Sequence, residues 1–251
     1  ELMNYLAGDI GNTFIKISIL NKNFAIIQSY NIDTHKVYQK KYINIFFKKL
    51  LKNNLNAKVL FSSVVPPVYK IFKDYLKKKK FKVFEVKSLN IRKIIKIKIK
   101  NFKQLGSDRI VNAIGANKHK NCLIIDFGTA TTFDIVKNSV YEGGVIAPGI
   151  NLSIINLNKF TALLPLINLK DKQKNYGKNT KEALNAGFLW GYEGLVNNII
   201  NKIVRRSRTN YRIILTGGYA KLFKKFINKK TEIDQNITIK GVAKVFRELL
   251  L

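Results

Sequence analysis

The sequence is poor in cysteine, histidine, proline and acidic residues, and each shortage narrows what the chain can be. Its 251 residues include one Cys, two His and four Pro. The single thiol, Cys122, cannot form an internal disulfide, and with two histidines it cannot build a Cys/His metal site. The sequence fits a reducing compartment, and we expect a cytoplasmic protein.

Long hydrophobic runs are also missing. No apolar stretch approaches the roughly 20 residues that a helix needs to cross a bilayer. The first residues lack the charged segment and apolar run of a signal peptide. We therefore expect no membrane partner and no secretion signal, with Met3 as the natural start of the chain.

Acidic residues are scarce beside basic ones. The chain has 15 Asp and Glu against 46 Lys and Arg, for a formal net charge of +31. Such an excess is typical of nucleic-acid-binding proteins. The lysines, however, are spread along the whole chain, and the densest runs, 77–80 and 205–208, follow predicted helices whose C-terminal ends they suit. We expect a solvated basic surface and no specific nucleic-acid partner.

Strand and helix patterns alternate along the chain, which favours an α/β fold. A strict alternation of Ile and Lys predicts a strand over 95–100. Asn179 and Glu182 have the spacing of a capping box and predict the start of a long helix. The predicted strands are 4–20 (a hairpin), 24–30, 58–61, 82–86, 95–100, 122–146 (a hairpin and a further strand), 211–215 and 237–239. The predicted helices are 38–55, 68–76, 107–118, 151–163, 180–205, 219–228 and 242–249.

Two hairpin turns carry the strongest functional signal. Asp9-Ile10-Gly11-Asn12-Thr13 and Asp126-Phe127-Gly128-Thr129-Ala130-Thr131 each follow an apolar strand and run into another strand. The glycine lets the backbone come close to a ligand, the turn N–H groups suit phosphate oxygens, and the Asp suits a hydrated Mg²⁺. Their repetition predicts a duplicated protein that binds a nucleotide between two halves, 1–105 and 106–251.

A third motif, Gly106-Ser107-Asp108-Arg109, stands at a predicted helix start with Ser107 as its candidate N-cap. Arg109 can pair with a carboxylate in a fork, and Asp108 can accept the proton of an alcohol. The alternative is simple helix capping with a local charge pair. Three further motifs follow in order, namely 143–149 (GGVIAPG), Asn179-Thr180 and Thr216-Gly217-Gly218.

The ordered motifs resemble those of type III pantothenate kinases, from about residue 4 to about residue 245. That family belongs to the superfamily of acetate and sugar kinases, Hsp70 chaperones and actin. The resemblance implies a duplicated actin-like ATPase (ribonuclease H-like) fold, in which each half has a mixed sheet flanked by helices. It also implies ATP-dependent phosphorylation of pantothenate to 4′-phosphopantothenate, the first step of coenzyme A biosynthesis.

The resemblance also assigns roles to residues and partners. Asp108 would be the catalytic base, Asp126 would hold a monovalent cation (K⁺ or NH₄⁺), and Asp9 would lie near Mg²⁺. The ATP-binding residues would be Asp9, Ile10, Gly11, Asn12, Thr13, Phe14, Ile15, Lys16 and Thr129. Pantothenate would contact Ile99, Gly106, Ser107, Asp108, Arg109 and Thr180. The protein would be a homodimer that pairs through the apolar residues of 180–204.

The chain departs from the family pattern at one place. Family members have Tyr-x-Asn-Pro before the Gly-x-Asp-Arg motif, whereas Ile99 and Phe102 stand here for the Tyr and the Pro. The substrate would thus lose a hydroxyl contact. Two alternatives remain open: a kinase of the same superfamily that acts on a sugar or another small alcohol, and a regulatory or nucleic-acid-binding relative without catalysis. The role of Asp134 is also open.

Overall fold

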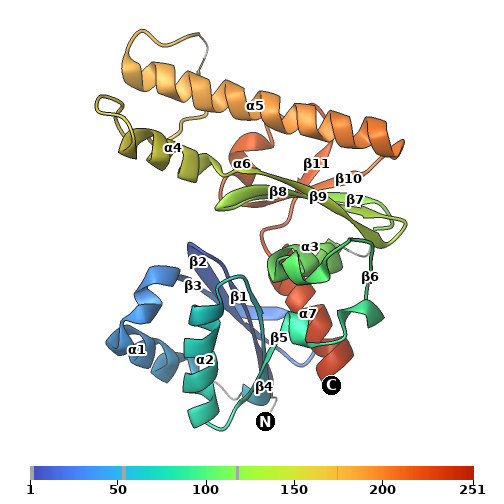
Figure 1. Ribbon diagram of the computed structural model, residues 1–251. Helices are drawn as coiled ribbons and strands as arrows, with labels where there is room; N and C mark the ends of the chain where they lie inside the picture. Colours follow the sequence, from blue (N-terminus) through green and yellow to red (C-terminus); the bar gives the residue numbers. More distant parts are fainter. Residues whose placement is uncertain (1–2, 53–54, 117–118, 174) are drawn as a thin grey trace. The chain divides into compact units, whose positions relative to one another are not determined.

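The computed structural model describes residues 3–52, 55–116, 119–173 and 175–251, which form two compact units (Figure 1). Unit 1 comprises residues 1–118, 139–141 and 236–251, and unit 2 comprises residues 119–138 and 142–235. Each unit has its own hydrophobic core, and the chain forms two sheets. Within the described residues, no helix is both long and apolar enough to cross a membrane.

The sheet of unit 1 has five strands in the order β3-β2-β1-β4-β5. β1 is antiparallel to β2 and parallel to β4, β3 is antiparallel to β2, and β5 is parallel to β4. The strands are β1 (Asn4–Ile10), β2 (Phe14–Leu20), β3 (Ile26–Asp33), β4 (Leu55–Ser63) and β5 (Lys82–Glu85). The turn between β1 and β2 is the first predicted phosphate turn.

Helices cover this sheet because their apolar residues recur on one side. α1 (Lys40–Leu50) and α2 (Pro66–Lys78) contribute the buried residues Phe47, Phe72 and Leu76 to the core of unit 1. Pro66 and Pro67 occupy the first turn of α2, where a missing N–H costs no hydrogen bond. Short 3₁₀ turns connect these elements at η1 (Thr34–Tyr38), η2 (Val86–Ser88), η3 (Ile91–Lys93) and η4 (Phe102–Gln104).

α3 (Ser107–Ala116) and the C-terminal helix α7 (Ile237–Leu250) pack closely together within unit 1. Gly241 makes this approach possible, since a Cβ there would lie 1.8 Å from the carbonyl oxygen of Val111. Thr238 also donates a 2.7 Å hydrogen bond to Asn112 Oδ1. The compact units therefore do not coincide with the predicted halves, because both helices fall in unit 1 although they lie beyond residue 105.

Unit 2 repeats the strand order of unit 1. The second sheet has six strands in the order β6-β9-β8-β7-β10-β11, and the five from β9 to β11 match the order of the first sheet. β6 (Lys96–Ile97) is the added edge strand; β7 is antiparallel to β8 and parallel to β10, and β10 is parallel to β11. The strands are β7 (Cys122–Phe127), β8 (Ala130–Lys137), β9 (Val140–Pro148), β10 (Arg212–Gly217) and β11 (Thr231–Ile233). The order shared by five strands of each sheet supports the predicted duplication.

Three helices accompany the second sheet: α4 (Ile150–Lys159), α5 (Thr180–Ser207) and α6 (Ala220–Phe223). Leu189, Val196 and Ile200 of α5 are buried against Leu123, Ile125 and other strand residues. The predicted capping of α5 is confirmed, since Glu182 N donates to Asn179 Oδ1 at 3.0 Å. The carboxylate of Glu182 accepts from Lys178 N rather than from Asn179 N.

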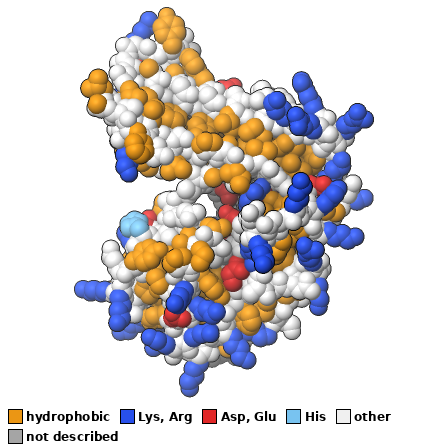
Figure 2. Space-filling model, viewed as in Figure 1, with side chains coloured by type: hydrophobic (Ala, Val, Ile, Leu, Met, Phe, Trp, Pro, Cys, Tyr) orange, Lys and Arg blue, Asp and Glu red, His pale blue; other side chains and the backbone are white. Residues whose placement is uncertain are grey.

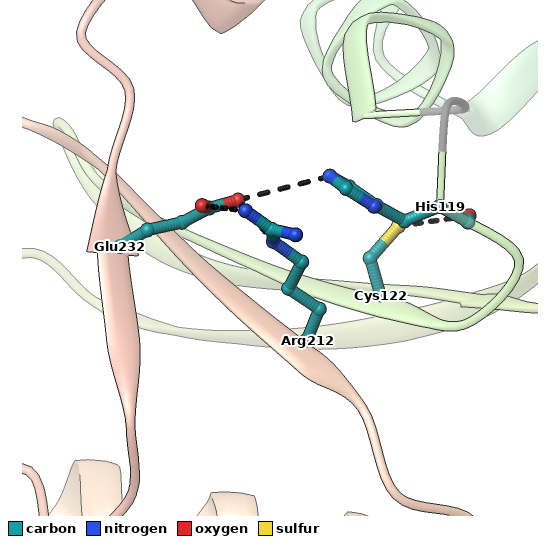
Figure 3. A network of polar contacts seen from close by, with 4 residues as sticks. All are labelled: His119, Cys122, Arg212 and Glu232. Atoms are coloured by element: carbon teal, nitrogen blue, oxygen red, sulfur yellow. Dashed lines mark hydrogen bonds and ion pairs between the residues drawn. The ribbon is translucent and has the colours of Figure 1, made fainter.

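The short edge strand β11 is held by a polar network (Figure 3). Arg212 donates through both Nε and Nη2 to the carboxylate of Glu232, and His119 Nε2 lies 3.9 Å from Glu232 Oε1. His119 is therefore a half-buried partner of a carboxylate. Burial, with the negative charge of Glu232, raises the pKa of the nearby Cys122 thiol to about 12.

Several predicted boundaries are wrong. The predicted strand over 95–100 pairs only at β6 (Lys96–Ile97), whose partner is Val140–Tyr141 of unit 1. The residues 237–239, predicted as a strand, begin α7, and the predicted helix over 219–228 is helical only at α6. β11 was not predicted. The predicted ends of the helices 38–55 and 107–118 reach residues 53–54 and 117–118, which lie outside the described residues.

Candidate active site

The first phosphate turn is fixed by hydrogen bonds to its main-chain carbonyl groups and within the turn, all inside unit 1. Gly11 N donates to Phe14 O at 3.1 Å, and Val64 N donates to Ile10 O at 3.1 Å. Thr34 donates twice, from its main-chain N to Thr13 O at 3.0 Å and from its hydroxyl to Gly11 O at 2.8 Å. Asn12 and Thr13 remain exposed. The turn is thus rigid and keeps its polar side chains available to a ligand.

The structure narrows the list of ATP-binding candidates in 9–16. Ile10 and Ile15 are completely buried in the core, so they can offer a ligand only main-chain groups. Asp9 and Lys16 are direct cross-strand partners, and Lys16 Nζ donates a 2.6 Å hydrogen bond to Asn236 Oδ1. Because paired residues of an antiparallel ladder project to the same face, the acidic and the basic side chain leave the sheet on one side here.

Asp9 has a second neighbour that the sequence did not single out. Ser62 pairs with it across the parallel β1–β4 ladder. The hydroxyl of Ser62 is buried and has no hydrogen-bond partner within the described part of the chain. A buried hydroxyl without a partner is costly, so its place beside a candidate metal carboxylate supports a polar ligand there.

The second phosphate turn is held in another way. Gly128 N donates to Ala130 O at 3.1 Å, and Gly218 N donates to Phe127 O at 3.1 Å. Gly149 approaches the turn so closely that a Cβ there would lie 1.9 Å from Thr129 O. Gly217 has a φ of +85°, and a Cβ on it would lie 2.6 Å from Asp126 Oδ1. The predicted role of these glycines, close backbone approach, thus has a geometric basis inside unit 2.

Asp126 lies among oxygen-bearing neighbours. Thr132 pairs with it on β8 and Thr216 pairs with it on β10. Thr216 is buried, and Thr129 at the tip of the turn is exposed. Carboxylate and hydroxyl oxygens are ligands for hard cations. The described residues hold no group of three or more His, Cys, Asp and Glu side chains that could bind a metal alone.

The Gly106–Arg109 motif starts α3 in unit 1. Ser107 is the first helical residue, and its hydroxyl donates to Glu85 Oε1. Its predicted role as N-cap is therefore wrong. Asp108 stands in the first turn, where its Oδ1 accepts a 2.8 Å hydrogen bond from Arg109 N. A Cβ on Gly106 would lie 2.4 Å from that same oxygen, so the glycine leaves room for the carboxylate.

The environment of Asp108 suits a proton acceptor. Burial raises the pKa of its carboxyl above the ordinary value, although Arg109 opposes this through its main-chain N–H and its charge. A base works best when its pKa lies closer to the working pH. Burial likewise raises the pKa of Glu85, against the hydrogen bonds from Ser107 and Lys87.

The remaining predicted substrate residues lie in different units. Ile99 is half-buried and follows β6 in unit 1, where Arg109 is also half-buried. Thr180 is the exposed first residue of α5 in unit 2. Since Asn179 caps α5, Thr180 has no capping task. The structure does not test the predicted contacts of these residues with pantothenate.

Sequence reasoning missed the residues that support the motifs. Ser62 and Thr216 are found only from strand register, and Glu85 and Thr34 only from hydrogen bonds that join distant segments. No local spacing marks such pairs. Thr216 was singled out only as part of a Gly-Gly turn.

Comparison with known sequences then decides the family. A family model described as type III pantothenate kinase matches residues 5–202. A type III pantothenate kinase of Pelagibacter ubique is 44% identical over 241 residues, covering 95% of this chain and 97% of the relative. The chain belongs to the type III pantothenate kinase family. A relative of that name from Fusobacterium nucleatum is 33% identical over 250 residues, covering 95% of this chain and 97% of its own length.

Solved structures support the fold of this pantothenate kinase family member. A Campylobacter jejuni protein described as a Baf family transcriptional activator superposes with a TM-score of 0.62 at 20% identity, covering 97% of this chain and 98% of its own. Component A of (R)-2-hydroxyglutaryl-CoA dehydratase from Acidaminococcus fermentans gives a TM-score of 0.54 at 11% identity, covering 97% and 96%. At these identities the likeness concerns the fold alone, and it confirms the predicted actin-like architecture.

Proposed function

We propose that this chain transfers the γ-phosphoryl group of ATP to pantothenate and so makes 4′-phosphopantothenate for coenzyme A biosynthesis. The observation that carries the proposal is the Gly106–Arg109 turn in a member of this family. It presents a partly buried carboxylate whose pKa is raised, next to a guanidinium group. Phosphoryl transfer needs positioning, charge neutralisation and a group that handles the proton of the acceptor hydroxyl.

Asp108 accepts the proton of the pantothenate hydroxyl that receives the phosphoryl group. Its Oδ1 is engaged by Arg109 N at 2.8 Å, which orients the carboxylate. The guanidinium of Arg109 binds the carboxylate of pantothenate, since a planar fork of N–H donors matches two carboxylate oxygens. Ile99 supplies an apolar contact in place of a hydroxyl, and Thr180 supplies a further hydroxyl to the substrate.

The two Asp-containing turns bind ATP. Asn12 and Thr13, with the main-chain N–H groups of the first turn, contact phosphate oxygens, and Lys16 neutralises phosphate charge. Asp9 lies near the Mg²⁺ that accompanies ATP, and the unpartnered Ser62 hydroxyl beside it suits a water of a hydrated Mg²⁺. Thr129 contacts ATP from the second turn. Bound Mg²⁺ supplies charge neutralisation to the phosphates.

Asp126 holds a monovalent cation, K⁺ or NH₄⁺. Its register neighbours, Thr132 and Thr216, add hydroxyl oxygens and no positive charge. At the equivalent position of unit 1 an ammonium group, that of Lys16, faces Asp9. A carboxylate with hydroxyl oxygens beside it offers a set of ligands that suits a bound cation.

The protein works as a homodimer that pairs through unit 2. The surface of α4 and the segment after it carries exposed apolar side chains, which gather over these elements in Figure 2. They include Leu152, Ile155, Leu157, Phe160 and Leu163, the last two being 77% and 90% exposed. Contiguous exposed apolar side chains of this kind mark interaction surfaces. Leu189 and Ile200 of α5, which the sequence suggested for pairing, are instead buried in the unit's own core.

A coupled assay of ADP release, with and without pantothenate, tests the proposed function. We expect ADP release that depends on pantothenate and on Mg²⁺, with a higher rate in K⁺ than in Na⁺ buffer. Equal release without pantothenate would refute the assignment of substrate. Activity with a sugar or another small alcohol in its place would favour the sugar-kinase alternative, and no turnover with any acceptor would favour the regulatory one.

A further inference from the structure

Glu85 joins the end of the first sheet to the start of α3. It is the last residue of β5, and each of its carboxylate oxygens accepts a hydrogen bond from a different segment. Oε1 accepts from the hydroxyl of Ser107, and Oε2 accepts from Lys87 N at 2.7 Å. Ser107 is only 1% exposed, so its hydroxyl is committed to this contact and is not a surface group.

Lys87 binds the segment that precedes Gly106. Its ammonium group donates to the carbonyl oxygens of Lys103 and Leu105, both at 2.8 Å. It also lies 5.8 Å from the ring centroid of Phe102, and Arg92 lies 5.8 Å from that centroid as well. Phe102 occupies the position where the family motif has a proline. Two cation–π contacts and two hydrogen bonds thus restrain a segment that a proline would stiffen.

These contacts enclose the turn that carries Asp108. The segment before Gly106 is held by Lys87, and the residue after Gly106 is held by Glu85. Hydrogen bonds to charged groups are about twice as strong as those between neutral groups, so both restraints are firm. The hydrogen bonds from protein donors to both oxygens of Glu85 favour its charged form and fix its orientation, which suits a positioning role.

We propose that Glu85 and Lys87 are positioning residues, which fix the Gly106–Arg109 turn through Ser107 and through the carbonyl groups of Lys103 and Leu105. The proposal rests on the proposed roles of Asp108 and Arg109 toward pantothenate. These contacts of Glu85 and Lys87 would therefore set the position of the acceptor substrate and not that of ATP. A displacement of about 1 Å in a reacting group can cost about 100-fold in rate.

Ser107→Ala is the cleanest test, because it removes one hydroxyl and leaves the bond between Glu85 and Lys87 N in place. We expect kcat/KM for pantothenate to fall about 10- to 100-fold, with KM for ATP unchanged. Ser107→Thr keeps the hydroxyl and should restore most of the activity. Lys87→Met, which keeps the apolar stem but loses the ammonium group, should produce the same split between the two substrates.

Ser88→Ala is the matched control. Its exposed hydroxyl donates to the main-chain oxygen of Glu85 at 2.6 Å, so it touches the same residue without holding the turn. This variant should keep wild-type kinetics. Equal kinetics of Ser107→Ala and wild type would overturn the proposal. A rise in KM for ATP as large as the rise in KM for pantothenate, together with a lower Tm, would also overturn it in favour of a purely structural role. An inactive wild-type enzyme would instead refute the proposed function.

Discussion

The two phosphate turns occupy the same place in two sheets that share an order of five strands, yet they are built differently. In unit 1, Thr34 holds the turn through two hydrogen bonds and Lys16 faces Asp9. In unit 2, Gly149 holds the turn by bare backbone contact and Thr132 faces Asp126. The N–H that follows the first parallel strand binds the turn at 3.1 Å in both, from Val64 and from Gly218.

This difference shows which features a duplicated fold keeps in both units and which it changes. The shared parts are backbone hydrogen bonds, which depend on strand order and not on side chains. The parts that differ are the side chains around each aspartate, which set the local charge. In unit 1 a lysine stands opposite the aspartate in the strand ladder, and in unit 2 two threonines stand opposite it. We therefore expect Asp9 and Asp126 to respond to different cations.

The largest effect should come from the carboxylate outside both turns. Asp108→Asn keeps the size of the side chain but cannot accept a proton, so kcat should fall about 10²–10⁴-fold. Asp74→Asn, an exposed change on α2, is the control and should leave kcat unchanged. Near-normal turnover of the Asp108 variant would reduce its role to that of helix structure.

The pH dependence of Asp108 has a definite sign. Because burial raises its pKa, kcat/KM should fall as the pH decreases through a value above the ordinary carboxyl range. Between the ordinary and the raised pKa the native state binds more protons than the unfolded state, so stability falls as pH rises through that window. The Asn variant has no carboxylate to bury in its charged form. Its Tm at neutral pH should therefore equal or exceed that of wild type.

Exchanging the aspartates one at a time sharpens the comparison. Asp9→Asn and Asp126→Asn should each lower kcat/KM for ATP by about 100-fold, since each removes the carboxylate that is proposed to hold a cation beside the phosphates. Asp9→Asn should raise the Mg²⁺ concentration needed for half-maximal rate, and Asp126→Asn should abolish the difference between K⁺ and Na⁺ buffers. Each variant is the control for the other. If both variants changed the Mg²⁺ and K⁺ dependence in the same way, the proposed difference between Asp9 and Asp126 would be wrong.

Adding a methyl group at Gly149 tests how the second turn is held. A Cβ would lie 1.9 Å from Thr129 O, so Gly149→Ala must displace the turn, at a cost of about 1–3 kcal/mol in the free energy of unfolding. Chemical denaturation measures this directly. Gly191→Ala is the control, because a Cβ there meets nothing within 4 Å. A Gly149 variant as stable as the wild type would show that the close approach is unimportant.

The smallest effect belongs to the first turn. Thr34→Val removes the hydroxyl bond to Gly11 O but keeps the main-chain bond to Thr13 O, so the free energy of unfolding should fall by about 0.5–1.5 kcal/mol. KM for ATP should rise only slightly. Thr161→Val, which loses a single exposed bond to Leu157 O, provides the baseline. A loss as large as that of Gly149→Ala would contradict the distinction drawn between the turns.

Local sequence patterns predicted most of the elements that carry the site. Both hairpins, the proline start of α2, the cap of α5 and the position of Asp108 in a first helical turn were predicted, because each depends on neighbours in the sequence. The start of α7 was wrong, because its apolar residues also suit a strand. Its helical state is tied to the close contact between Gly241 and Val111, which no local pattern shows.

The candidate site could be predicted only in part for the same reason. Asp9, Asp108 and Asp126 stand in recognisable motifs, but Glu85 lies 22 residues from the Ser107 that it binds. The strand predicted over 95–100 failed because Lys96 and Ile97 pair only with Val140 and Tyr141. The alternation of Ile and Lys indicates that a strand can form, but which strand it pairs with depends on tertiary structure.

The most direct test of the account is identification of the product. Purified protein, ATP, Mg²⁺ and pantothenate in K⁺ buffer should yield a new phosphomonoester signal in the phosphorus NMR spectrum, with the mass of 4′-phosphopantothenate and in amounts equal to the ADP formed. The Asp108→Asn variant should form this product only very slowly. Formation of ADP with inorganic phosphate and no phosphopantothenate would contradict the claim that this chain phosphorylates pantothenate.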